Sequence, residues 1–313
     1  MPNVMPVRMR VAEFIPDGNG GTKRNTDYKN VSELNTDKPV WVVIHGREDR
    51  DDSGKMLELE KALTDAGYQV VTIDWREAAG ANTPESVGLQ SESWIQAVGD
   101  WSFRALKSAG ISGSNIRIGS HSFGSFAGFE IAQHFKNENG FGVNTFIALD
   151  SAKDATLSAR YDASQVNFAT VSKTSTAFHS SFWGSEGRSN TAEHTVELRS
   201  AMASFDPLYN QTLKHGLAVT TFANLIRLKN IDPTNNLAKE FSFSDSETSL
   251  LPTREGVDSW LFVDSELKNG TIADDNYISA MPRKMTHTNP DDNIVDSYVF
   301  NTLFNLQQSI SQQ

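Results

Sequence analysis

The stretch from Ile116 to Phe126 constrains the fold most, because it is typical of a strand, a sharp turn and the start of a helix. Ile116 and Ile118 are β-branched strand formers, and phenylalanines recur at roughly helical spacing after Gly124. A serine at the apex of such a unit, here Ser122, sits in a strained turn that exposes its hydroxyl. The N–H groups at the start of the helix favour negative charge at the same point. The sequence therefore predicts a nucleophilic serine at 122.

The turn departs in one position from the usual pattern G-x-S-x-G. Ser120 stands where the first glycine is expected, and Gly119 comes one place earlier. That first position must hold a small residue because backbone packs against it, and serine is small. A polar turn without a catalytic role is the alternative interpretation.

Apolar runs of strand length alternate with helical patterns through the first half of the chain. The predicted strands cover 39–44, 70–73, 116–118 and 143–149, with amphipathic helices between them. Alternation of this kind predicts an α/β fold, with a mostly parallel sheet covered by helices on both faces. Functional sites in such folds lie at the carboxyl ends of the strands. Four polar residues lie just past the ends of predicted strands: His45, Asp74, Ser122 and Asp150.

The regular alternation ends before the C-terminus. After Asn230 the sequence becomes polar, and Trp260–Val263 is a predicted strand within it. We therefore assign residues 1–230 to a catalytic domain and 231–313 to a C-terminal extension. The extension either packs on the edge of the same sheet or forms a small β-rich appendage.

The formal net charge of −11 argues against a nucleic-acid partner, because phosphate contacts need clustered cations. The chain has no cysteine, which excludes disulfides, a thiolate nucleophile and thiolate metal sites. No apolar run is long enough to predict a transmembrane helix. Residues 1–16 carry no run of signal-peptide type. Two compartments remain open: an extracellular location without a recognisable N-terminal signal, and the cytoplasm.

A serine nucleophile needs a general base, and the base needs an acid that orients it. With a serine elbow, the order along the chain is serine, acid, histidine. Asp150 is the first acid after the elbow helix that also ends a predicted strand. Asp154 is the alternative, but no strand precedes it.

Three downstream histidines compete for the role of base. His179 follows a short apolar run and suits a buried core position, and His194 begins an alternating strand pattern. His215 stands where the loop predicted for 200–214 enters an amphipathic helix. Position alone favours His215 and leaves His194 open.

The oxyanion needs two N–H donors, of which one follows the nucleophile and one comes from an earlier strand end. These positions are Phe123 and Arg47, and His45 in the same loop is expected to contact substrate. Aromatic residues in the loops downstream of Asp150 are expected to line an acyl pocket, with core packing as the alternative: Phe178, Phe182, Trp183, Phe205 and Tyr209.

Several of these segments together resemble the pancreatic-lipase-like branch of the α/β hydrolases, which includes lipases and type-1 phospholipases A. The resemblance runs from about Pro39 to Arg227. It is carried by five motifs in the family's order: VIHG at 43–46, TIDWR at 72–76, IGSHSFG at 118–124, LDSA at 149–152 and HGLAVTTF at 215–222. The resemblance implies the α/β-hydrolase fold, Asp150 rather than Asp154 as the acid, and His215 rather than His194 as the base.

The departures from the family narrow the expected substrate. The family's disulfides are absent, and few residues separate His194 from His215, so any lid is short. A short lid goes with phospholipase or general esterase activity rather than with action on triglyceride droplets. The family's calcium stretch has a counterpart at Arg160, Asp162 and Gln165, where Gln165 replaces an acid. Calcium is therefore weakly supported, and no other metal or cofactor is expected.

The sequence thus predicts a serine carboxylic ester hydrolase of lipase, phospholipase or esterase type that acts on a lipid or a small ester through an acyl-enzyme. Its predicted triad is Ser122, Asp150 and His215. An acyltransferase with the same triad is one alternative. A non-catalytic binding protein on the same fold is another, suggested by Ser120 and by the altered calcium stretch.

Overall fold

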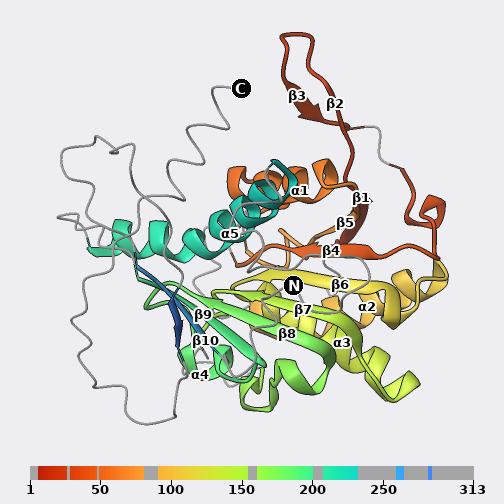
Figure 1. Cartoon of the computed structure of the whole chain (residues 1–313). Coiled ribbons are helices and arrows are strands. Elements are labelled where there is room, and N and C mark those ends of the chain that lie inside the picture. Colours follow the sequence, from red (N-terminus) through yellow and green to blue (C-terminus); the bar gives the residue numbers. More distant parts are fainter. Residues whose placement is uncertain are drawn as a thin grey trace.

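The computed structural model describes residues 6–26, 29–47, 49–80, 91–153, 161–199, 207–231, 259–263 and 281–283. In this part of the chain one nine-stranded sheet forms the centre of the molecule (Figure 1). Its spatial order is β1 (Arg8–Val11), β5 (Gln69–Asp74), β4 (Val40–Ile44), β6 (Ile116–His121), β7 (Val143–Leu149), β8 (Ser172–His179), β9 (His194–Arg199), β10 (Ser259–Val263) and β11 (Met281–Arg283).

The strands from β5 to β10 are all parallel to one another, while β1 and β11 are antiparallel at the two edges. β2 (Phe14–Pro16) and β3 (Thr22–Arg24) form a separate antiparallel pair. The predicted fold class is confirmed: this is the α/β-hydrolase fold, with a mostly parallel sheet and helices on both faces. The carboxyl ends of the parallel strands meet at one edge of the sheet, where sites are expected.

Two pairs of helices cover the two faces of the sheet (Figure 1). α1 (Gly54–Asp65) and α5 (Pro207–Ile231) pack together on one face, and α2 (Ile95–Ser108) and α3 (Gly124–Asn139) pack together on the other. The remaining helical elements are short: α4 (Glu186–Ser189), η1 (Val31–Glu33), η2 (Ser91–Trp94), η3 (Gly113–Asn115), η4 (Ala163–Gln165) and η5 (Phe168–Thr170).

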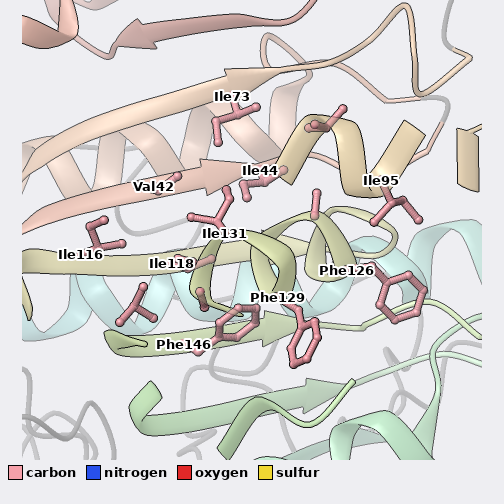
Figure 2. Close-up of a cluster of buried hydrophobic side chains, with 14 of the residues drawn as sticks. Val42, Ile44, Ile73, Ile95, Ile116, Ile118, Phe126, Phe129, Ile131 and Phe146 are labelled. Carbon is pink, nitrogen blue, oxygen red and sulfur yellow. The ribbon is translucent and has the colours of Figure 1, made fainter. Parts of the chain in front are cut away.

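Successive side chains of a strand point to opposite faces of the sheet, so the short strand β4 contributes to the apolar clusters on both faces. In β4, Trp41 and Val43 belong to the apolar cluster under α1 and α5, whereas Val42 and Ile44 belong to the cluster under α2 and α3. All five residues of β4 are fully buried. Figure 2 shows the second cluster, in which Val42 and Ile44 lie near residues of β6, β7 and α3. The continuous apolar run at 40–44 is thus the signature of a strand buried on both faces.

The start of one helix differs from the sequence prediction. The helix predicted to open at His215 begins at Pro207, so residues 207–214 are helix rather than loop. Proline is favoured at the first position of a helix, because its fixed φ suits the helix and its missing N–H has no partner there. This start signal outweighs the polar composition that favoured a loop.

The C-terminal extension contributes strands to the central sheet. The predicted strand at 260–263 falls within β10, which pairs in parallel with β9. Apart from Ile231, β10 and β11, the residues of 231–313 lie outside the described part of the chain. None of the helices in that described part combines the length and apolar character needed to cross a membrane.

Candidate active site

Ser122 lies on the turn between β6 and α3 in a left-handed backbone conformation, with φ of 55°. Two glycines make room for this turn. A Cβ on Gly124 would come within 2.4 Å of the His45 carbonyl oxygen, and one on Gly46 would come within 2.7 Å of the Ser122 Cβ. The turn is therefore packed directly against the backbone that follows β4, as a nucleophile elbow requires.

The predicted triad residues lie in one hydrogen-bonded row. The Nε2 of His215 is 2.8 Å from the Ser122 Oγ, and its Nδ1 is 2.6 Å from the Asp150 Oδ2. Ser122 follows β6, Asp150 follows the adjacent strand β7, and His215 lies on α5. In space the order is that of a nucleophile, a base and an orienting acid, and along the chain the order is serine, acid and histidine.

The short segment after β8 encloses the carboxylate of Asp150. The N–H groups of Ser180 and Ser181 donate to its Oδ1 at 2.7 and 3.2 Å, and the Ser181 hydroxyl donates to its Oδ2. Asp150 is fully buried and has φ of 48°, and a Cβ on Gly184 would lie 2.2 Å from its Oδ1. The site thus holds a buried carboxylate by hydrogen bonds from both sides, as burial of a charge requires.

His121, the neighbour of the nucleophile, contacts the base. Its Nε2 is 3.0 Å from the backbone oxygen of His215, and the two rings are 4.6 Å apart. Burial lowers the pKa of His121 well below its usual value, and the charges of Lys55 and His215 lower it further. The ring is therefore neutral, and because a carbonyl only accepts, its proton is on Nε2.

Arg47 and Phe123, whose N–H groups are the predicted oxyanion donors, are close together. The guanidinium of Arg47 lies 5.3 Å from the centre of the Phe123 ring. Phe123 precedes the first residue of α3, and Gly46, next to Arg47, packs on Ser122. Both loops therefore border the nucleophile.

The expectation that His45 contacts substrate is wrong, because its ring is fully buried. The Trp75 N–H donates to the His45 Nε2 at 3.1 Å, and the indole N–H of Trp75 donates to its carbonyl at 2.8 Å. His45 Nδ1 is 2.9 Å from the Gly46 oxygen. His45 thus joins the ends of β4 and β5 and fixes the loop that carries Arg47.

The expectation that Phe178 lines an acyl pocket is also wrong. Phe178 is 1% exposed and packs against Phe222 of α5, at 5.7 Å between ring centres. The reason is its place in β8, a strand with neighbours on both sides and α5 above it. Trp183 is 37% exposed and meets the His215 ring edge-on at 5.8 Å, beside the site. Phe205 lies outside the described residues, and Tyr209 is described only as part of α5.

A cavity of about 420 Å³ opens beside the segment that encloses Asp150, and its lining includes His179 but not Ser122. Both charged and aromatic side chains line the cavity, including Lys153, Phe182, Glu186, Glu197 and Lys214.

Two sequence candidates remain, one for the base and one for the acid. His194, the other competing base, begins β9, and Asp154 lies outside the described residues.

The calcium stretch is described only in part. Arg160 lies outside the described residues, and Asp162 caps η4 by accepting from the N–H and hydroxyl of Ser164. Gln165 ends the same turn and its side-chain amide is 3.2 Å from the Ser164 hydroxyl. Across the described ranges, no three His, Cys, Asp or Glu side chains come together as a metal site. Calcium binding here stays a prediction.

A buried ionic cluster fixes the loop that follows β4. Asp51 is fully buried, and its carboxylate accepts from Arg10 at 3.2 Å, from Arg24 at 2.8 Å and from Arg76. Asp74 accepts from Arg10 and Arg76 in turn. Although burial alone would raise the pKa of Asp74, hydrogen bonds and the charge of Arg76 lower it well below its usual value. The N-terminal strands are thereby tied to the loop that carries Arg47.

Sequence reasoning missed Ser181 and His121, the two polar side chains that contact the predicted triad from outside it. A signal for Ser181 was present, because Ser180 and Ser181 directly follow a strand next to the one that ends at Asp150. No comparable signal existed for His121, since its contact depends on where α5 crosses the elbow.

No protein-family model matches the sequence, and no curated protein matches it. Solved structures with a similar fold include EstE1, a thermostable carboxylesterase cloned from a metagenomic library, with 14% identity, 70% of this chain and 76% of that chain covered, and a TM-score of 0.31. Mouse alpha/beta hydrolase domain-containing protein 10 has 13% identity, 69% and 98% coverage, and a TM-score of 0.37. An esterase of Pyrobaculum calidifontis has 15% identity, 74% and 81% coverage, and a TM-score of 0.32. These overlaps are weak, so the chemistry of this chain rests on its own residues.

Proposed function

We propose that this chain is a serine carboxylic ester hydrolase that acts through an acyl-enzyme. The observation that carries the proposal is the row Ser122–His215–Asp150, with 2.8 Å between the first two side chains and 2.6 Å between the last two. A buried carboxylate on Nδ1 keeps the lone pair of Nε2 directed at the serine hydroxyl, which is what a general base needs.

The proposed reaction has two halves. Ser122 Oγ attacks the ester carbonyl carbon while His215 Nε2 takes its proton, and the N–H groups of Phe123 and Arg47 stabilise the oxyanion. The C–O bond then breaks, and His215 gives the proton to the leaving alcohol. In the second half His215 activates a water molecule, which releases the acid and regenerates the serine.

Within this class we assign the chain to the pancreatic-lipase-like type, with a lipid or a small ester as substrate. Two features support this: the five motifs stand in the family's order, and Asp150 directly follows the strand after the elbow helix, where the family has its acid. The few residues between His194 and His215 favour phospholipid or short-chain esters over triglyceride droplets.

Labelling with a fluorophosphonate probe tests the proposal. The wild-type protein and a Ser112→Ala control, altered at an exposed turn serine, should label, and Ser122→Ala should not. Nitrophenyl esters of increasing acyl length, phosphatidylcholine vesicles and a triglyceride emulsion then separate esterase, phospholipase and lipase.

Other outcomes would point to the two alternatives. Absence of labelling in folded wild-type protein would contradict the proposal and favour a binding protein on this fold. A labelled protein that forms a new ester rather than free acid when an alcohol is added would be an acyltransferase.

A further inference from the structure

The hydroxyl of Ser181 has contacts that determine where its single proton points. Its Oγ accepts from the backbone N–H groups of Trp183 and Gly184, each at 3.2 Å, and the Gly184 N–H is shared with the Ser181 carbonyl at 3.1 Å. A serine hydroxyl has one proton and two lone pairs, so these two contacts occupy its acceptor capacity. The proton is left for the nearest acceptor, which is the Oδ2 of Asp150.

The same hydroxyl also lies 3.2 Å from the Nδ1 of His215. With both lone pairs occupied, Ser181 competes poorly for the proton on Nδ1, which goes to Asp150 at 2.6 Å. Nε2 is then the unprotonated nitrogen, and it faces the Ser122 hydroxyl at 2.8 Å. The direction of one buried hydroxyl thereby selects the tautomer that the base requires.

We propose that Ser181 is a positioning residue that orients the Asp150 carboxylate and, through it, the His215 ring. The inference rests on the proposed function, because a tautomer matters only if His215 acts as a base. It adds a fourth side chain, from the segment after β8, to the three that the motifs identify.

Replacing Ser181 by alanine removes a donor from Asp150 and leaves its negative charge more available to the imidazolium of His215. Because the neutral ring is the active form, the acid limb of the kcat/KM profile should move to higher pH by about half a unit. We expect kcat to fall about tenfold with KM nearly unchanged, since the proposed role of Ser181 is to orient the base and not to bind substrate.

Ser180→Ala is the matched control. Ser180 is 7% exposed against 5% for Ser181, and its hydroxyl donates to the Lys214 carbonyl at 2.7 Å rather than to Asp150. Each variant loses the hydrogen bond that its own hydroxyl donates, and Ser181→Ala also loses the two that the Ser181 hydroxyl accepts from Trp183 and Gly184. Only Ser181→Ala should move the acid limb, because only Ser181 donates to Asp150. Ser181→Thr keeps the hydroxyl and should restore the wild-type limb. The other titratable groups next to His215, namely His121 and Lys55, stay the same in all three variants.

A second measurement needs no substrate. The proton shared between His215 Nδ1 and Asp150 should give a low-field NMR signal in the resting protein, which Ser181→Ala should shift and Ser180→Ala should leave in place. If Ser181→Ala does not fold, Ser181→Cys replaces it, because a thiol fills the same space and donates weakly.

The outcomes distinguish a failure of the proposed role of Ser181 from a failure of the proposed ester hydrolase function. An unchanged limb and an unchanged signal in Ser181→Ala, or equal shifts in both alanine variants, would overturn the role of Ser181. Wild-type protein that neither labels with fluorophosphonate nor cleaves esters would overturn the proposed function instead, and the NMR signal would still report on Ser181.

Discussion

Ser120 and Gly128 face each other inside the elbow: a Cβ atom added to Gly128 would lie 3.2 Å from the Ser120 Oγ. Ser120 is fully buried on β6, at the position where a glycine is usual. The helix that follows the nucleophile therefore leaves space for the extra side chain of the strand before it. The departure from G-x-S-x-G is compensated by a glycine on α3.

This relationship predicts coupling between the two positions. Gly128→Ala should destabilise the protein by about 1–3 kcal/mol, because the added methyl crowds Ser120 and also Ile118, at 3.0 Å. In a protein that already carries Ser120→Gly, the Gly128→Ala substitution should lower the free energy of unfolding by measurably less. Urea denaturation of the two single variants and the double variant gives the interaction free energy. Strict additivity would show that the two side chains do not compete for space.

The cluster around Asp51 predicts that the N-terminal strands depend on one buried carboxylate. Asp51→Asn leaves Arg10, Arg24 and Arg76 facing a neutral group, and loss of one partner from a buried pair costs about 3–5 kcal/mol. Asp65→Asn is the control, since it breaks an exposed pair with Lys61 that contributes less than about 1 kcal/mol. Equal losses of unfolding free energy in the two variants would contradict the structural role of Asp51.

The raised pKa of the buried Glu60 carboxyl predicts that the folding stability of the protein depends on pH. Burial raises the pKa of this carboxyl from 4.5 to about 8, in spite of the attraction of Arg24. The folded protein therefore holds a proton that the unfolded chain releases, so this group makes folding less favourable as the pH rises from about 4.5 to 8. In Glu60→Gln the melting temperature should fall less steeply over that window. Parallel curves for the two proteins would show that Glu60 does not titrate there.

The hydrogen bond between His121 and the His215 carbonyl predicts that two amide substitutions at position 121 will differ in activity. Glutamine places its amide nitrogen near the position of Nε2, so His121→Gln should keep the hydrogen bond to the His215 carbonyl and most of the activity. His121→Asn is too short to reach this carbonyl, and kcat should fall about tenfold through misplacement of the base. Ester hydrolysis by both variants at matched thermal stability checks this prediction. Equal rates would mean that the contact does not position His215.

The neutral His121 ring also has a pH consequence in the unmodified protein. Because its folded pKa is depressed, the unfolded chain takes up a proton first as the pH falls below the usual histidine range near 6.5. The folding stability that the neutral His121 ring contributes is therefore fully present above that pH range and is lost as the pH falls below it. Both amide variants lack an ionisable group at this position, so their stability should not show this loss.

The strands and their ends could be predicted from sequence, because each follows from a local pattern. The run at 40–44 is apolar throughout since β4 is buried on both faces, and Ser122 and Asp150 directly follow such strands. The start of α5 was missed because one proline outweighed a polar composition. Phe178 was misassigned because a strand residue can face the core or the site, and only the position of α5 decides which.

Contacts between distant segments that no motif links could not be predicted. Asp51 meets arginines from positions 10, 24 and 76, and no spacing in the chain indicates that these segments converge. Ser181 lies thirty-one residues after Asp150, within the adjacent strand connection, and its role depends on the direction of one hydroxyl.

Both Ser122 and Asp150 have positive φ, a conformation that glycine adopts more easily than any other residue. They are the only non-glycine positions in the described ranges with this property. Laboratory evolution that screens only for heat resistance would therefore enrich glycine at position 122, because the substitution relieves backbone strain there. At position 150 the same substitution would also leave the buried donors of Ser180 and Ser181 without an acceptor. Such a screen would select against the proposed nucleophile, so any stabilisation of this protein has to be screened for turnover as well.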